Sequence, residues 1–191
     1  MYVALEGIDG VGKSTQIEIL KSYFPEAIFT KEPGGTKFGE RAREILLYEK
    51  LESKKAELFL FLADRAEHFK EVIEPNLDRL IISDRSLISG IAYAIASNPE
   101  FELEFLIELN RFALDNRLPQ KVVFFKINIV ELVERLTKKV NDNIEKRGFD
   151  YLLKIQDSML EVIKRLEIDY LEVDATNDIS SITKQIVEYL G

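Results

Sequence analysis

The sequence predicts a single α/β domain in which helices flank a five-stranded parallel sheet. Two observations lead to this prediction: short apolar runs of strand length recur along the chain, and longer segments with helical spacing lie between them. Nearly continuous apolar strands that alternate with helices are typical of a parallel sheet covered on both faces. A length of 191 residues suits one well-buried core, so one domain spanning residues 1–191 is expected.

The apolar runs define the strands, and the segments between them define the helices. The clearest predicted helices are residues 13–23 and 129–136, where apolar residues share one face. Parallel sheets bind ligands beyond the carboxyl ends of their strands. The motifs that follow the first three runs, "EGIDGVGKST", "EPGGT" and "DRS", are therefore expected to meet at one edge. The predicted strands are residues 2–5, 27–31, 80–83, 121–127 and 170–173.

Composition and charge exclude several classes of function. The net charge of −8 argues against a nucleic-acid polymer or an anionic membrane as the main partner, since both favour a basic protein face. The chain has no cysteine, which excludes disulfides and thiolate chemistry. His68 is the only histidine, so a Ser–His pair or a His-rich metal site is not expected, and we expect His68 to be an ordinary helical residue. No leader peptide or apolar run of ~18 residues is recognisable, so a cytoplasmic protein is expected.

The segment "LEGIDGVGKSTQ", residues 5–16, contains the pattern Gly, four residues, Gly-Lys-Ser between a predicted strand and a predicted helix. Such a loop surrounds phosphates with backbone N–H groups, and the helix N-terminus adds its dipole. Lys13 is expected to contact the outer phosphates, and Ser14 to offer its hydroxyl to magnesium. The alternative is a glycine-rich turn with a surface lysine. The residues predicted to bind ATP in this loop are Gly7, Ile8, Asp9, Gly10, Val11, Gly12, Lys13, Ser14 and Thr15.

The rest of the chain narrows the class of nucleotide-binding protein. A guanine-reading Asn-Lys-x-Asp motif is missing, and so is an Asp-x-x-Gly switch outside the loop, which weakens a GTPase interpretation. A helicase or strand-exchange ATPase would need a longer chain and a basic groove. A small phosphotransferase fits best.

Four further blocks follow the loop in order along the chain: "TKEPGGTKFGERAREILL", "LFLFLADRAEHF", "DRSLISGIAY" and "EVDAT". With the loop, they resemble the thymidylate kinases over nearly the whole length. The resemblance implies the P-loop NTPase fold, with a short lid at about residues 137–150, and transfer of the terminal phosphate of ATP to dTMP with magnesium. It also implies a homodimer, for which the apolar faces of residues 87–96 and 103–112 are candidates, although both could equally be core.

The resemblance also implies roles on the acceptor side. Arg85 would bind the acceptor phosphate, and Asp9 would contact the sugar 3′-hydroxyl, although Asp9 could instead cap the turn. Phe61 and Arg65 share a helix face and would stack on thymine and hydrogen-bond its edge, whereas Phe61 alone would more often be core. Tyr93 would lie under the sugar, or be a packed tyrosine with a satisfied hydroxyl. Lys31 and Arg43 could equally be surface charges. The residues predicted to bind dTMP are Asp9, Lys31, Pro33, Arg43, Phe61, Arg65, Arg85, Ser89, Gly90 and Tyr93.

The remaining predictions concern the metal, the donor side and the lid. Asp84 is expected to join Ser14 at the metal, with a strand-end ion pair to Arg85 as the alternative. On the donor side the predicted ATP contacts are Arg135, Ala175 and Thr176. Catalysis is assigned to Lys13, Arg85, Asp9 and Arg147.

Two positions depart from the family pattern. Ser86 stands where a tyrosine is usual, and Asn143 stands where the lid usually supplies a catalytic arginine. A transition-state arginine is worth orders of magnitude in rate, so its role is expected to move to a nearby basic residue. Alternatively, the reaction proceeds with Lys13, Arg85 and magnesium alone. The candidates for the moved role are Lys138, Lys139, Lys146 and Arg147.

The sequence therefore predicts a dTMP kinase that uses ATP and magnesium in dTTP synthesis. The alternative within enzymes is a kinase for another nucleoside monophosphate or for a deoxynucleoside, because one thymine methyl contributes only ~1–3 kcal/mol to discrimination. From another class, the alternative is a slow nucleotide-dependent switch.

Overall fold

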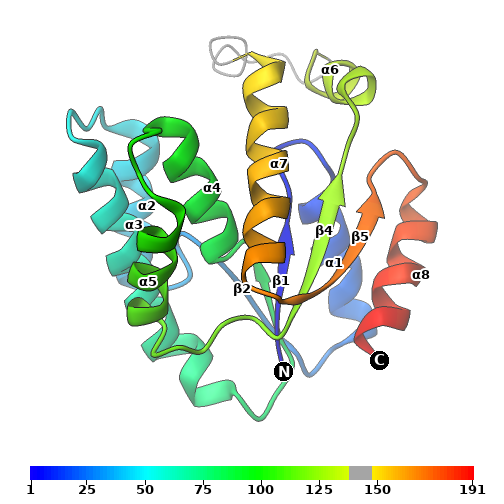
Figure 1. Ribbon diagram of the computed structural model, residues 1–191. Coiled ribbons are helices and arrows are strands. Elements are labelled where there is room, and N and C mark those ends of the chain that lie inside the picture. The colour runs from blue at the N-terminus through cyan, green and yellow to red at the C-terminus, as the bar shows by residue number, and fades with distance from the viewer. Residues whose placement is uncertain (138–147) are drawn as a thin grey trace.

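The computed structural model describes residues 1–137 and 148–191, and in them the predicted five-stranded parallel sheet is confirmed (Figure 1). The strand order is β2-β3-β1-β4-β5, and every pairing is parallel. Each strand begins and ends within one residue of the predicted run. The strands are β1 (Tyr2–Glu6), β2 (Ile28–Lys31), β3 (Ile81–Asp84), β4 (Lys121–Lys126) and β5 (Asp169–Asp174).

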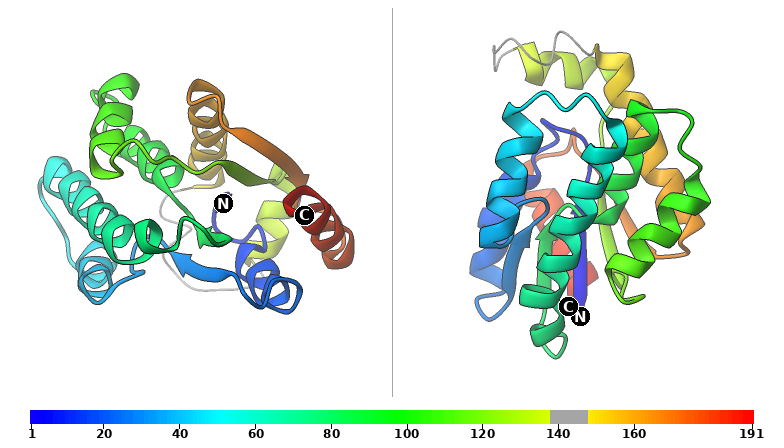
Figure 2. Two further views of the ribbon diagram at one scale, coloured as in Figure 1. Left: turned by 90° about the horizontal axis from the view of Figure 1, so that it is seen from below. Right: turned by 90° about the vertical axis from the view of Figure 1, so that its left-hand side faces the viewer.

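Helices cover both faces of the sheet, as the apolar strands require. Helices α1 and α8 pack together on one face and α4 and α7 on the other, while α2, α3 and α5 lie beyond α4 (Figures 1 and 2). A π-helical turn, η1, and a 3-10 turn, η2, lead from α3 towards β3. The helical elements are α1 (Lys13–Tyr23), α2 (Lys37–Tyr48), α3 (Lys54–His68), η1 (Phe69–Ile73), η2 (Glu74–Asn76), α4 (Leu87–Ser97), α5 (Leu103–Ala113), α6 (Ile129–Thr137), α7 (Phe149–Arg165) and α8 (Ile179–Leu190).

The core lies around β1 and β4, the strands in the middle of the sheet. Every residue of β1 is buried, including Glu6 at its carboxyl end. Apolar side chains of α4 and α7, among them Ile88, Ile91 and Met159, are fully buried against this layer, and burying each such side chain contributes roughly 1.5–3 kcal/mol. Within residues 1–137 and 148–191, none of the helices combines the length and apolar character that a membrane span requires.

Local sequence explains how the helices near the sheet edge begin. The Thr36 hydroxyl accepts a hydrogen bond from the Gly39 N–H at the start of α2, and Ser53 does the same for Ala56 at the start of α3. Ser86 occupies the N-cap of α4. The first turns of α1, α2 and α4 thus follow directly on the loops after β1, β2 and β3, at the edge where the motifs were expected to meet.

Candidate active site

The phosphate loop runs from the end of β1 to the start of α1. Gly12 has φ 95° and occupies the left-handed N-cap of α1, a conformation that glycine adopts without a steric cost. A Cβ at Gly7 would lie 2.9 Å from the carbonyl oxygen of Phe125 on β4, so this glycine lets the loop pass close to the neighbouring strand. The two glycines thereby allow the N-terminus of α1 to face the loop, the geometry that binds phosphate groups.

Lys13 lies inside this loop and is 7% exposed. Its Nζ donates hydrogen bonds to the carbonyl oxygens of Gly7 at 2.7 Å and Ile8 at 3.1 Å. Burial lowers the pKa of Lys13 to about 8, with a contribution from the Arg85 cation, while nearby carboxylates such as Asp84 oppose the shift. The ammonium group is therefore held at the loop by acceptors that a phosphate can replace.

Arg85 connects the phosphate loop to α4. Its Nη1 donates to the Gly7 carbonyl oxygen at 3.0 Å and to Ser89 Oγ at 2.9 Å, and its Nη2 donates to Asp9 Oδ1 at 2.6 Å. The guanidinium also lies 5.6 Å from the centroid of the Tyr93 ring. Burial raises the pKa of Tyr93 to about 12, and the Arg85 cation opposes that rise, so the hydroxyl stays protonated near neutral pH. The backbone of Arg85 has φ 72°, which is left-handed and strained for a residue with a Cβ.

Glu6 accepts hydrogen bonds from the two serines that begin α4. Ser86 Oγ donates to its Oε1 at 2.7 Å, and Ser89 Oγ donates to its Oε2. Burial raises the pKa of Glu6, and the bonds from Ser89 and Ser86 oppose that shift. Ser86, which stands where the family usually has a tyrosine, thus ties α4 to β1. Ser89 was predicted to bind dTMP, and here it joins Glu6 to Arg85.

A cavity of about 300 Å³ lies beside Arg85 and contains nearly all the residues predicted to bind dTMP. Its wall comes from the phosphate loop, the loops after β2 and β3, and helices α2, α3 and α4. We call it the acceptor pocket. Among the residues predicted to bind dTMP, those that line it are Asp9, Pro33, Arg43, Phe61, Arg65, Arg85, Ser89, Gly90 and Tyr93. Further lining residues that the motifs did not single out are Glu32, Leu46, Leu47, Glu57 and Ser86.

Lys31 is the exception. It lines a neighbouring cavity of about 420 Å³ together with Ser14, Gly34 and Asp84. The Oδ1 atom of Asp84 is buried and has no hydrogen-bond partner in the described part of the chain. A buried carboxylate oxygen without a partner is costly, and oxygen ligands suit magnesium. The residues predicted for the metal, Ser14 and Asp84, thus lie in one cavity and fit that ion.

The predicted donor-side residues also come together. Arg135 Nη2 donates to the carbonyl oxygen of Ala175 at 2.6 Å, and its Nε donates to Glu131 at 2.6 Å. The Thr176 hydroxyl donates to Asp174, which folds the turn after β5. Most of the predicted lid, with Arg147, Lys138, Lys139, Lys146 and Asn143, lies outside the described residues.

A buried polar cluster lies behind the acceptor pocket and includes His68. The expectation that His68 is an ordinary helical residue is therefore wrong. The side chain is fully buried and hydrogen-bonds through both ring nitrogens, Nδ1 to Glu32 Oε1 at 2.9 Å and Nε2 to Thr30 Oγ1 at 2.6 Å. Burial would raise the pKa of Glu32, but the Arg65 cation and then His68 outweigh it, so the Glu32 pKa lies below its ordinary value. We call Thr30, Glu32, Arg65, His68 and Asn110 the Glu32 cluster.

Comparison with known proteins shows which family the chain belongs to. Residues 5–186 match the family model for thymidylate kinase. The chain is 52% identical over 191 residues to a thymidylate kinase of Sulfurimonas denitrificans, 50% over 190 residues to one of Sulfurovum and 53% over 195 residues to one of Nautilia profundicola. These alignments cover 100% of this chain and 98–100% of each relative.

The chain belongs to the thymidylate kinase family.

Membership of the thymidylate kinase family does not by itself explain three residues that the motif analysis missed. Glu6, Glu32 and Asn110 are buried and charged or polar, and each bonds a residue that lines the acceptor pocket. A sequence signal existed for the first two, because each carboxylate follows a strand-forming run and precedes glycine or proline at the sheet edge. Asn110 gives no such signal, since it occurs within an ordinary amphipathic helix.

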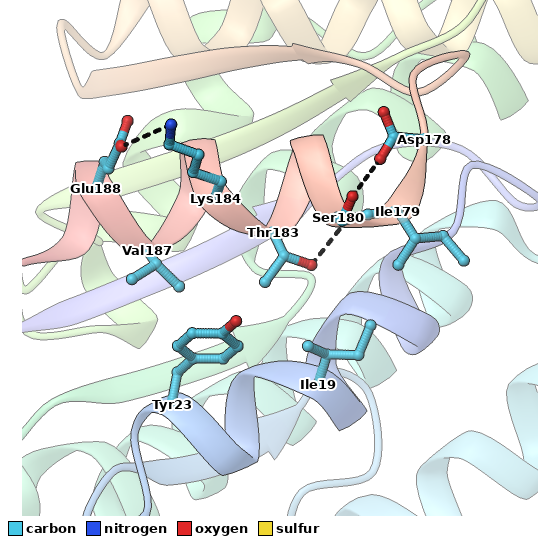
Figure 3. A pocket seen from close by; sticks show the side chains of 9 residues that line it. All are labelled: Ile19, Tyr23, Asp178, Ile179, Ser180, Thr183, Lys184, Val187 and Glu188. Atoms are coloured by element: carbon cyan, nitrogen blue, oxygen red, sulfur yellow. Dashed lines mark hydrogen bonds and ion pairs between the residues drawn. The ribbon is translucent and has the colours of Figure 1, made fainter.

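A different kind of cavity, of about 850 Å³, lies between α1 and α8 (Figure 3). Ile19 and Tyr23 extend from α1 towards α8, where Ile179 and Val187 provide apolar surface. Two of its charged groups pair with each other, Lys184 with Glu188 at 3.8 Å, and Asp178 accepts a hydrogen bond from the Ser180 hydroxyl. Within the described chain, the residues lining this cavity include none from the phosphate loop. The chemistry expected of a thymidylate kinase therefore belongs at the sheet edge.

Proposed function

We propose that this member of the thymidylate kinase family transfers the γ-phosphoryl group of ATP to dTMP, forming dTDP for dTTP synthesis. The observation that carries the proposal is the position of Arg85, which bonds Gly7 and Asp9 of the phosphate loop and also lines the acceptor pocket. An anion held by this guanidinium lies next to the phosphates held by the loop. Donor and acceptor are therefore brought together by one cation.

The proposed reaction needs positive charge more than acid–base chemistry. The second pKa of a phosphate monoester is about 6, so the acceptor phosphate is already a nucleophile near neutral pH. Arg85 and Arg43 are proposed to hold it, and Arg43 is oriented by donating from Nη1 to the Pro33 carbonyl oxygen at 3.0 Å. Lys13 and the loop amides are proposed to stabilise the charge on the transferred group.

Recognition of the nucleoside is proposed to depend on the wall formed by α3 and α4. Phe61 is half-buried and offers a ring to the base, beside the guanidinium of Arg65. Tyr93, under the Arg85 cation, is proposed to face the sugar, and Asp9 its 3′-hydroxyl. The Gly90 position leaves room for Arg65, because a Cβ there would lie 2.8 Å from Arg65 Nη2.

The donor side is proposed to use the loop, magnesium and the residues near Arg135. Ser14 and Asp84 would hold magnesium, which when bound neutralises charge on the ATP phosphates. Arg135 is proposed to bind ATP, and Ala175 and Thr176 to contact its adenine, supported by the bond between Arg135 and the Ala175 carbonyl oxygen. The catalytic role of Arg147 remains a prediction, because that residue lies outside the described chain.

We further propose a homodimer in the cytoplasm. Of the two candidate faces, residues 87–96 are largely core, with Leu87, Ile88 and Ile91 fully buried. By contrast, Phe105 is 56% exposed and Phe112 is 86% exposed, and both lie on one face of α5 because they are seven residues apart. Contiguous exposed apolar surface marks association surfaces. Light scattering should give twice the monomer mass, and a monomer at micromolar concentration would contradict the proposal.

The test of the proposed function is ADP release with ATP, magnesium and one acceptor at a time from dTMP, dUMP, UMP, AMP, CMP and thymidine. We expect turnover to be fastest with dTMP, with some turnover of dUMP because one methyl contributes only ~1–3 kcal/mol. Faster turnover with AMP, or with thymidine but not dTMP, would refute the assignment. ADP release at the same slow rate with and without every acceptor would indicate a switch.

A further inference from the structure

His68 does not line the acceptor pocket, but hydrogen bonds connect it to residues that do. Within the described chain, the residues that line the pocket include Glu32 and Arg65 but not His68. The imidazole lies behind them with 0% exposure, and it binds the carboxylate of Glu32 on one side and the hydroxyl of Thr30 on the other. Because an ionised carboxylate only accepts, Nδ1 must donate to Glu32. The histidine therefore fixes one oxygen of Glu32 from the side remote from the pocket.

The other oxygen of Glu32 fixes Arg65. Arg65 Nε donates to Glu32 Oε2 at 2.9 Å, and Nη1 and Nη2 donate to Asn110 Oδ1 at 2.5 Å and to the Ser86 carbonyl oxygen at 3.2 Å. A guanidinium has five N–H groups in one plane, so these bonds leave two for a ligand. Since Arg65 lines the pocket, the orientation of that plane decides where the two remaining donors point.

The loop after β2 is closed tightly against the imidazole. A Cβ at Gly35 would lie 2.5 Å from His68 Cδ2 and 2.7 Å from His68 Nε2, so this position has room for glycine alone. Asp64, whose pKa burial raises, bonds the Gly34 N–H at 3.1 Å and is the further titratable group on α3 next to this loop. His68 is thus enclosed by β2, the loop and its own helix.

We propose that His68 is a positioning residue for the acceptor pocket: through Glu32 it sets the orientation of the Arg65 guanidinium, and so the affinity for the acceptor base. The inference rests on the proposed function, because it takes the pocket to bind dTMP. It assigns His68 no contact with the acceptor, the ATP phosphates or the reacting atoms. Its effect must therefore fall on the Michaelis constant for dTMP.

Three variants separate this role from packing alone. His68→Leu removes the donor to Glu32, and should raise the KM for dTMP by about tenfold, the usual loss for one hydrogen bond to a charged group, while kcat and the KM for ATP stay within about twofold. His68→Asn retains an amide donor near the Nδ1 position and should restore the KM for dTMP to within about threefold of wild type. Thr30→Val removes only the Nε2 partner and should have an effect no larger than that of His68→Asn.

Two kinetic outcomes for His68→Leu would overturn the inference. One is an unchanged KM for dTMP in folded His68→Leu, and the other is an equal rise in both Michaelis constants. An effect of Thr30→Val as large as that of His68→Leu would also overturn it, because the route through Glu32 would then be wrong. The wild-type enzyme in the same assay tests the proposed function separately. If wild type does not phosphorylate dTMP, the proposed function is wrong, whereas the hydrogen bonds that link His68 to Arg65 are unaffected by that result.

A second measurement needs no variant. His68 is the only histidine, so ¹⁵N-labelled protein gives one set of imidazole resonances. We expect saturating dTMP to shift the Nδ1 resonance, because a ligand on Arg65 acts on Glu32, and we expect ADP with magnesium to leave it unchanged. Unmoved imidazole resonances at saturating dTMP would overturn the inference even if the leucine variant fails to fold.

Discussion

The proposed acceptor side and the proposed donor side of the site are built differently. On the acceptor side, Arg65 is 2% exposed and its Nε, Nη1 and Nη2 atoms all donate to protein acceptors. On the donor side, Lys13 is bonded to carbonyl oxygens of the very loop that must receive phosphates. The acceptor wall is therefore organised before any ligand binds, whereas on the donor side a ligand must replace existing partners.

This difference indicates how specificity and catalysis are divided. Pre-oriented donors favour one base over another, because an ill-fitting ligand leaves buried polar groups unpaired. A lysine that exchanges carbonyl oxygens for phosphate oxygens can follow the charge as it moves during transfer. Changes on the acceptor side should thus alter selectivity, and changes on the donor side should alter rate.

The largest effect is expected from Lys13→Ala. Removing the buried cation should lower kcat by about a thousandfold or more, because charge on the transferred group loses a main stabilising contact. Affinity for dTMP, measured by calorimetry, should change by less than about fivefold. Equal losses in kcat and in dTMP affinity would break the division between the two sides.

The next largest effect is expected from Arg65→Lys. Lysine keeps the positive charge beside Glu32 but lacks the planar fork, so it cannot serve Glu32, Asn110 and a ligand together. We expect kcat/KM for dTMP to fall by about 30-fold to 100-fold, corresponding to ~2–3 kcal/mol, with little change in the KM for ATP. A comparable rise in the KM for ATP would remove Arg65 from the acceptor side.

A smaller effect on stability should distinguish the two loops. Gly35→Ala on the acceptor side must displace His68 and the Lys31 carbonyl oxygen, and should lower the free energy of unfolding by ~1–3 kcal/mol. Gly12→Ala in the phosphate loop meets no atom within 4 Å, so only its φ of 95° costs stability, by about 1 kcal/mol. Urea unfolding measures both, and a larger loss for Gly12→Ala would contradict the tighter packing of the acceptor side.

The most gradual effect is expected from pH. Because burial lowers the pKa of Lys13 to about 8, Lys13 in the free protein loses its charge as pH rises through that value. Above that pH, ATP binding must be accompanied by uptake of a proton on Lys13. ATP affinity should weaken by up to about tenfold per pH unit above about 8, with proton uptake visible by calorimetry in two buffers. Affinity for dTMP should vary much less over the same range. Identical pH dependence for both ligands would show that Lys13 does not belong to the donor side alone.

Local sequence patterns predicted the strands and the phosphate loop, because both depend on neighbouring residues. Residues 2–5 form an apolar run that becomes β1, and the glycine spacing around Lys13 is itself the motif. The role of His68 could not be predicted in this way. Its partner Glu32 lies 36 residues away, and Glu6 and Ser86 are separated by 80. The strand order brings these distant residues together, and a single sequence does not reveal that order. A lone histidine in a helical segment is therefore interpreted as an ordinary helical residue.

The left-handed backbone of Arg85 bears on why arginine occupies this position. A side chain with a Cβ costs roughly 1–2 kcal/mol in this conformation, whereas glycine adopts it freely. The ion pair to Asp9, which is 65% exposed, offsets little of that cost, whereas the bonds to the Gly7 carbonyl oxygen and to Ser89 Oγ offset part of it. Arginine at this position therefore carries a backbone cost that glycine would avoid. The guanidinium is retained for its proposed role in binding the acceptor phosphate, so engineering for thermal stability should leave position 85 unchanged.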